Sequence, residues 1–124
     1  IGYSEPIAHQ IEAGSDVFLM PSRFEPCGLN QLYSLRYGTL PIVRNTGGLA
    51  DSIVDASDEN RQQGTATGFK FELSTALALQ QTIQDAIDLF ERPRIWRKLV
   101  VTAMESDFSW QKSAEKYIEL YEQL

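Results

Sequence analysis

Residues 16–33, DVFLMPSRFEPCGLNQLY, contain an apolar strand, a tight loop and the beginning of a helix. The apolar run at 17–20 is typical of a parallel strand buried on both faces, and Pro21 ends it. Gly28 lets the backbone approach a ligand closely, and the first amides of a helix from about Leu29 have no partner within that helix. Because such amides and the helix dipole suit a phosphate, this loop is predicted to be an anion site.

The rest of the chain continues the alternation of strand, loop and helix that is typical of an α/β fold. The predicted elements are a helix over 5–12, strands over 16–20, 40–43 and 69–71, a helix from Leu29 to about residue 36 that stops at Gly38, a short helix after Thr46, and helices from about Ser74, Pro93 and Ser109 onward. The polar stretch between residues 55 and 68 is predicted to be a mobile surface loop.

Composition narrows the class of protein. At 124 residues the chain is long enough for one domain and too short for two. Seventeen acidic and eleven basic residues give a net charge of −6, and without a cluster of Lys and Arg nucleic acid is not an expected partner. An acidic chain still binds a phosphate where backbone amides gather locally.

Cysteine content and hydropathy indicate the compartment. The single cysteine, Cys27, excludes an internal disulfide and fits a reducing environment. The apolar runs are far shorter than the roughly 18 residues that span a bilayer, and there is no signal-peptide pattern, so we expect no membrane partner. A cytoplasmic location is predicted.

Three motifs together resemble the bacterial glycogen synthase and plant starch synthase family. They are SRFEPCGL at 22–29, YGTLPIV at 37–43 and TGGLAD at 46–51. The resemblance extends upstream through His9 and AGSD at 13–16, and downstream to FSW at 108–110, so it covers nearly the whole chain.

The resemblance implies both a reaction and a fold. The family transfers glucose from a nucleotide sugar, here ADP-glucose, to the non-reducing end of an α-1,4-glucan with retention of the anomeric configuration. Its GT-B fold has two Rossmann-like halves, with the active site between them. The expected partners are the nucleotide-sugar donor and the glucan acceptor, with no metal and no cofactor; in a plant, the location would be the plastid.

The length and the first residue set the expected domain organisation. Residues 1–124 are interpreted as the latter part of the C-terminal, nucleotide-sugar-binding domain, a Rossmann-like parallel sheet of three layers with a helical C-terminal end. Because the chain begins with Ile1 rather than Met, the N-terminal domain and the first strands of this domain are expected to lie in a preceding part of a longer protein.

Glu25 is the candidate catalytic residue. From the sequence alone, a helix-entry acid beside free amides, worth about 0.3–1 kcal/mol, is an equal interpretation. The resemblance favours function: Glu25 would contact the donor glucose and stabilise an oxocarbenium-like transition state, and whether it also becomes a covalent nucleophile stays open. Related GT-B families have a second Glu eight residues later, where this chain has Tyr33, as glycogen synthases do.

The donor phosphates and sugar are assigned to two glycine-containing turns. By resemblance, backbone amides of Cys27, Gly28 and Leu29 hold the phosphates, although a plain tight turn explains the same residues. The second turn consists of Thr46, Gly47 and Gly48 and would border the sugar or the phosphates, or simply join a strand to a helix. Asn30 would lie near the phosphate or act as an ordinary cap.

The adenine and ribose are assigned to two tyrosines. Tyr3 lies twenty-two residues before Glu25, where the family has an aromatic residue that stacks on adenine, and a half-buried core tyrosine is the alternative. Tyr33 replaces the second Glu of related families at the ribose.

Other residues have less specific interpretations. His9 lies among apolar neighbours, which favours a packed histidine over an acid–base role. Arg23 either orients Glu25 or pairs with a surface acid. The stripe of Trp110, Tyr117 and Tyr121 on the last helix is expected to contact the core of this chain, with the preceding domain as the alternative, and no residue set has metal-ligand spacing.

The chain alone is expected to be inactive. The family's basic pair that neutralises the leaving diphosphate precedes this segment, and electrostatic stabilisation is usually the largest catalytic contribution. The alternative function is a non-catalytic nucleotide-binding module, or a degenerate glycosyltransferase-like scaffold.

Overall fold

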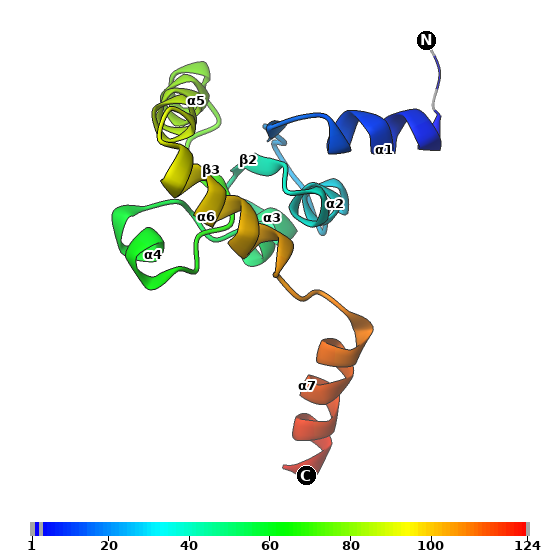
Figure 1. Cartoon of the computed structure of the whole chain (residues 1–124). Helices are drawn as coiled ribbons and strands as arrows, with labels where there is room; N and C mark the ends of the chain where they lie inside the picture. Colours follow the sequence, from blue (N-terminus) through cyan, green and yellow to red (C-terminus); the bar gives the residue numbers. More distant parts are fainter. Residues whose placement is uncertain (1, 3, 124) are drawn as a thin grey trace.

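A parallel sheet of three strands forms the centre of the molecule in a computed structural model that describes residue 2 and residues 4–123 (Figure 1). The strands are β1 (Val17–Met20), β2 (Leu40–Arg44) and β3 (Phe69–Phe71), in the spatial order β1-β2-β3. Val17 pairs with Leu40, and Ile42 pairs with Phe69. The predicted α/β fold with a parallel sheet is confirmed.

Seven helices surround and extend this sheet in the described residues. They are α1 (Glu5–Ala13), α2 (Asn30–Tyr37), α3 (Gly47–Ser52), α4 (Asp58–Gln63), α5 (Ala76–Phe90), α6 (Pro93–Met104) and α7 (Trp110–Glu122). Their limits follow local signals: Gly38 ends α2 with φ 77°, Pro93 begins α6, and the Ser109 hydroxyl accepts a hydrogen bond from the Lys112 amide at the start of α7. None of these helices has the length and apolar character needed to cross a lipid bilayer.

Helices lie on both faces of the sheet. Side chains alternate between faces along a strand, so Val17 and Leu19 share one face, where they line a cavity with Ile42 and with residues of α5. Phe18 points to the opposite face and lines a cleft with residues of α1 and α2. This gives the three layers expected of a doubly covered parallel sheet.

Burial is greatest at β2, in the middle of the sheet. Residues 40–43 are all buried, and β1 is less buried than its apolar sequence predicts. Leu19 is 48% exposed, and the other β1 residues are half-buried. The prediction of burial on both faces is therefore wrong for β1, because among the described strands it has a partner on one side only.

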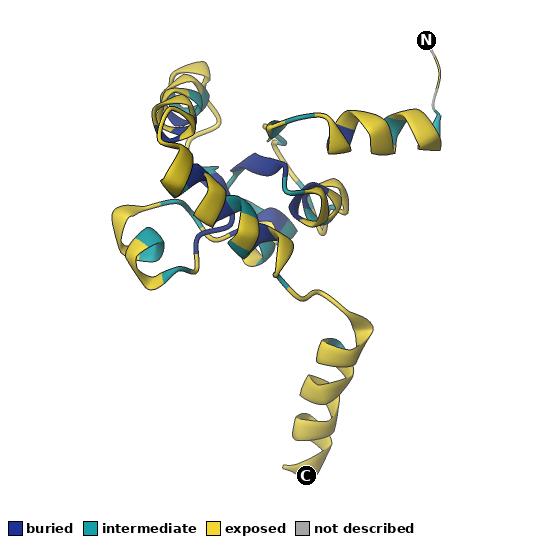
Figure 2. Ribbon diagram, in the orientation of Figure 1, coloured by how far each residue is buried: buried dark blue, intermediate teal, exposed yellow. Residues whose placement is uncertain are grey.

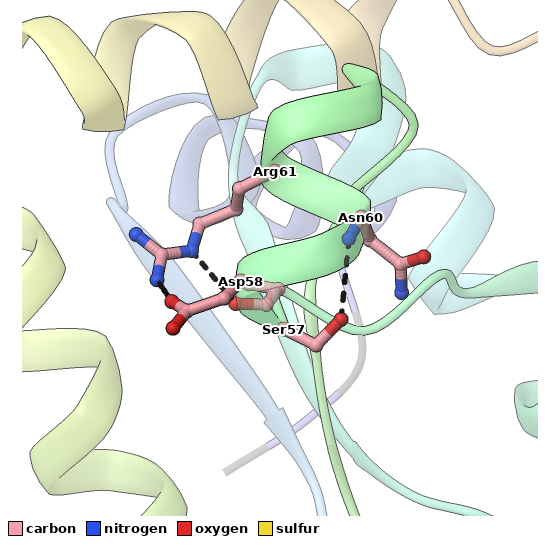
Figure 3. A network of polar contacts seen from close by, with 5 residues as sticks. Ser57, Asp58, Asn60 and Arg61 are labelled. Atoms are coloured by element: carbon pink, nitrogen blue, oxygen red, sulfur yellow. Dashed lines mark hydrogen bonds and ion pairs between the residues drawn. The ribbon is translucent and has the colours of Figure 1, made fainter.

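The polar stretch between residues 55 and 68 contains a helix, which corrects the prediction of a loop. In α4 the Ser57 hydroxyl accepts a hydrogen bond from the Asn60 amide, and Arg61 forms an ion pair with Asp58 (Figure 3). Gly64 ends the helix with φ 74°. Local capping at both ends stabilises a segment with no buried residue of its own.

Helix α7 projects away from the sheet (Figure 1) and is exposed along its length (Figure 2). Trp110 is 89% exposed, and Tyr117 and Tyr121 are exposed as well. The expectation that this stripe contacts the core of the chain is wrong, since none of its aromatic side chains is covered. Before the helix, the Ser109 amide donates a 2.8 Å hydrogen bond to Asp107, which lowers the pKa of that carboxyl below its ordinary value.

Candidate functional site

The two predicted glycine turns lie against each other at the carboxyl ends of β1 and β2. The Gly48 amide donates hydrogen bonds to the carbonyls of Glu25 at 3.1 Å and Pro26 at 3.2 Å. A Cβ on Gly47 would lie 2.1 Å from the Glu25 carbonyl oxygen, and one on Gly48 would lie 2.1 Å from the Cys27 carbonyl oxygen. This approach leaves no room for a side chain at either position, so both turns form one site.

Glu25 is half-buried, and its carboxylate is held by a neighbour in the same loop. The Ser22 hydroxyl donates a 3.0 Å hydrogen bond to Glu25 Oε2. Arg44, the last residue of β2, fixes the loop backbone by donating from Nε to the Ser22 carbonyl at 2.8 Å and from Nη2 to the Arg23 carbonyl. The Arg23 side chain forms no ion pair within the described residues, which supports neither predicted role for it.

The start of α2 presents free backbone donors beside Glu25. Gly28 has φ 73°, a conformation that suits glycine, and the exposed Leu29 is the N-cap residue. The Leu29 carbonyl accepts hydrogen bonds from the Leu32 and Tyr33 amides, so the hydrogen bonding of the helix begins at Leu29. The preceding amides have no acceptor within this helix, which is the property predicted for an anion site.

Asn30 and Tyr33 line a cleft of about 380 Å³ between α1 and α2, which contains no residue of the two glycine turns. No side chain caps α2, so the capping interpretation of Asn30 is not supported. His9 lines the same cleft and is exposed rather than packed, which corrects its predicted burial. Its Nδ1 lies 3.0 Å from the Tyr37 hydroxyl oxygen, and its ring centroid lies 6.3 Å from that of Tyr33.

Three further residues were predicted to belong to the site: Thr46, Cys27 and Tyr3. Thr46 is the N-cap residue of α3 and makes no capping bond with its side chain. Cys27 is exposed and contributes its carbonyl to the loop contacts. Tyr3 lies outside the described residues, so its predicted stacking role stays a prediction.

The sequence reasoning missed three residues that hold the loops together: Gln31, Arg44 and Ser52. The Gln31 side chain is buried and donates to loop carbonyls and to the Ser52 hydroxyl, which in turn donates a 2.6 Å bond to the Gly48 carbonyl. Gln31 shares the buried face of α2 with Ser34 and Leu35, and this largely polar face has no apolar periodicity from which Gln31 could be identified. The available signal for Arg44 was its position, because it is a charged residue directly after the apolar residues 40–43.

The arrangement combines backbone donors, a carboxylate and an adjoining cleft. Amides at the start of α2 suit an anionic group, and Glu25 beside them suits positive charge that develops close to that anion. Within residue 2 and residues 4–123, no group of three His, Cys, Asp or Glu side chains lies close enough to hold a metal ion.

Comparison with known proteins identifies the family of the chain. Residues 2–99 match the family described as "Glycosyl transferases group 1". The chain is 56% identical over all of its 124 residues to "Glycogen synthase" of Thioalkalivibrio sulfidiphilus and, at the same identity, to "Glycogen synthase" of Haemophilus influenzae. It spans about a quarter of the length of these curated relatives, 26% in both cases.

A solved structure has the same fold. The "Catalytic domain of Starch Synthase IV from Arabidopsis thaliana bound to ADP and acarbose" superposes with a TM-score of 0.88 at 40% identity, over 99% of this chain and 25% of that one. The predicted resemblance and the predicted fold class are both confirmed. The chain belongs to the group 1 glycosyl transferases, and among them it is similar to the glycogen and starch synthases.

Proposed function

We propose that the protein containing this chain transfers glucose from ADP-glucose to the non-reducing end of an α-1,4-glucan with retention of configuration, and that this chain supplies much of the donor pocket. The observation that carries the proposal is the junction of the two glycine turns at the start of α2, beside Glu25. Ligands of open α/β sheets bind beyond the carboxyl ends of the strands, which is where this junction lies. The similarity to a starch synthase that binds ADP supports the choice of nucleotide.

Each residue has a role in this proposal. Amides of Cys27, Gly28 and Leu29 hold the diphosphate, and the Gly47 turn borders the sugar. Asn30 lies beside the phosphate, and Tyr33 lines the cleft that would receive the ribose and adenine. Glu25, oriented by Ser22, stabilises the positive charge that develops on the donor sugar as the bond to the diphosphate breaks.

Activity is proposed for the whole protein only. The resemblance places a basic pair and the acceptor-binding domain outside these residues, so we expect the 124-residue chain alone not to catalyse transfer. Amides alone neutralise a departing diphosphate less well than amides paired with cations. A cytoplasmic location and a neighbouring N-terminal domain are parts of the same proposal.

The test is the substitution Glu25→Gln in the full-length protein, assayed with ADP-glucose and a glucan primer. We expect kcat to fall by about 10²–10³ with little change in the ADP-glucose KM, because the carboxylate acts mainly in the transition state. Glu91→Gln, at an exposed position after α5, is the matched control. Near-normal turnover of Glu25→Gln would remove Glu25 from the mechanism, and ADP binding by an unsubstituted protein that transfers no glucose would favour a non-catalytic module.

A further inference from the structure

Gln31, the second residue of α2, is a polar side chain buried beneath the loop that joins β1 to α2. It is 1% exposed. Its Nε2 lies 3.1 Å from the Cys27 carbonyl oxygen, 3.0 Å from the Gly28 carbonyl oxygen and 3.2 Å from Ser52 Oγ. Its Oε1 is buried and has no hydrogen-bond partner among the described residues. Because a buried, unpaired amide oxygen is unfavourable, this glutamine is expected only where its NH2 group is needed.

The two carbonyls that Gln31 holds belong to the peptide units whose N–H groups are those of Gly28 and Leu29. In a trans peptide the carbonyl and the N–H point in opposite directions, and no cis peptide occurs in the described residues. By binding the carbonyls of Cys27 and Gly28, Gln31 therefore directs the N–H groups of Gly28 and Leu29 away from the core. Neither N–H donates a hydrogen bond within the described part of the chain.

Gly28 and Gln31 fit each other sterically. A Cβ at position 28 would lie 2.5 Å from Gln31 Oε1 and 3.0 Å from Nε2. The glycine thus provides the space that the glutamine amide occupies, as well as the positive φ of the loop.

The same amide connects the loop to the second glycine turn. The Ser52 hydroxyl oxygen accepts a hydrogen bond from Gln31 Nε2. The same hydroxyl donates a 2.6 Å hydrogen bond to the Gly48 carbonyl. Gly48 in turn donates its amide to the carbonyls of Glu25 and Pro26. The contacts form a closed circuit that contains both glycine turns and the backbone of Glu25.

We infer that Gln31 is a positioning residue for the donor diphosphate, which it never touches. Its NH2 group sets the direction of the Gly28 and Leu29 N–H groups, two of the three amides proposed to hold the diphosphate, and through Ser52 it holds the second turn against the first. The inference rests on the proposed function for the identity of the ligand.

The test is Gln31→Met in the full-length protein, with ADP binding measured by calorimetry and with steady-state kinetics. Methionine has a similar length and keeps the site filled, but it donates no hydrogen bond. We expect the ADP Kd and the ADP-glucose KM to rise by at least about tenfold, with the glucan KM changed by less than about twofold. A role in stability alone would not separate donor from acceptor in this way.

Two further variants make the test specific. Gln31→Glu keeps the shape of the side chain but replaces its NH2 group with a carboxylate oxygen that faces the carbonyls of Cys27 and Gly28. The loss of ADP affinity should be at least as large as in Gln31→Met. This second variant keeps the inference testable even if the methionine variant folds poorly. Gln80→Met, at an exposed position of α5, is the matched control and should behave like the unsubstituted protein.

The outcomes separate this inference from the proposed function. An ADP Kd within about twofold of the unsubstituted value in either folded Gln31 variant would overturn the positioning role, whatever the activity. An unsubstituted protein that binds ADP without transferring glucose would overturn the proposed function and leave the Gln31 result interpretable from binding alone. An unsubstituted protein that does not bind ADP would overturn both.

Discussion

The hydroxyl of Ser22 donates a 3.0 Å hydrogen bond to the carboxylate of Glu25, and the carbonyl of the same serine accepts a bond from Arg44. The carboxylate is thereby connected to the last residue of β2, a central element of the fold. Glu25 thus has a defined orientation even though it lies in a loop, which is the arrangement that electrostatic stabilisation of a transition state requires.

Ser22→Ala tests this orientation in the full-length protein. A hydrogen bond to a charged group contributes about 1.5–3 kcal/mol, and partial exposure of Glu25 places the expected effect at the lower end, a loss of about tenfold in kcat. The KM for ADP-glucose should change little, because the serine hydroxyl bonds to Glu25 and not to the loop residues assigned to the diphosphate. Ser74→Ala, at an exposed position, is the control, and a kcat equal to that of the control would show that Glu25 needs no orienting partner.

Gly48→Ala tests whether the two glycine turns require contact between their backbones. A Cβ at this position would lie 2.1 Å from the Cys27 carbonyl oxygen, so the turns must separate. We expect the free energy of unfolding to fall by about 1–3 kcal/mol, as is typical of overpacking, together with weaker ADP binding. Urea unfolding with Gly2→Ala as the control measures the first effect, since a Cβ on Gly2 meets nothing within 4 Å. Equal stability of the two variants would contradict the close contact.

The sheet and most helix limits could be predicted because their signals are local. Apolar runs identified β1 and β2, the strand predicted at 69–71 was found as β3, and Gly38, Pro93 and Ser109 marked helix ends at the positions found. Helix α4 was missed although Ser57 and Gly64 are capping residues, because a helix that is polar all round has no apolar periodicity to detect.

Only the part of the site whose backbone geometry follows from residue type, such as a turn that contains glycine, could be predicted from the sequence. Glu25 and the two glycine turns lie in backbone contact, whereas Gln31 and Ser52 bind carbonyls whose directions depend on the folded loop. Periodicity identified α7 as amphipathic but carries no information on what its apolar stripe contacts, which is why the expected core contact was wrong.

The two tryptophans give a direct test of the different burial of α6 and α7. Trp96 is 9% exposed and packs on Phe69 and Phe90 with ring centroids 6.2 and 5.1 Å apart, whereas Trp110 is 89% exposed. In the 124-residue chain, Trp96→Ala should lower the free energy of unfolding by about 3–5 kcal/mol. Trp110→Ala should change it by no more than about 0.5 kcal/mol. Comparable losses in the two variants would show that α7 packs on the rest of the chain.

Addition of ADP to the isolated 124-residue chain tests where the nucleotide binds. We expect weak binding, because the amides at the start of α2 are present while the basic pair implied by the resemblance lies elsewhere. The largest changes in the amide NMR spectrum should fall on residues 27–29 and on the turn at residues 46–48, since a phosphate there alters the N–H groups it contacts and Gly48 bonds to the same loop. The matched control is titration with adenosine, which lacks the phosphates and should leave these amides unchanged. Changes confined to α4 or α7 would show that the nucleotide binds away from the two glycine turns.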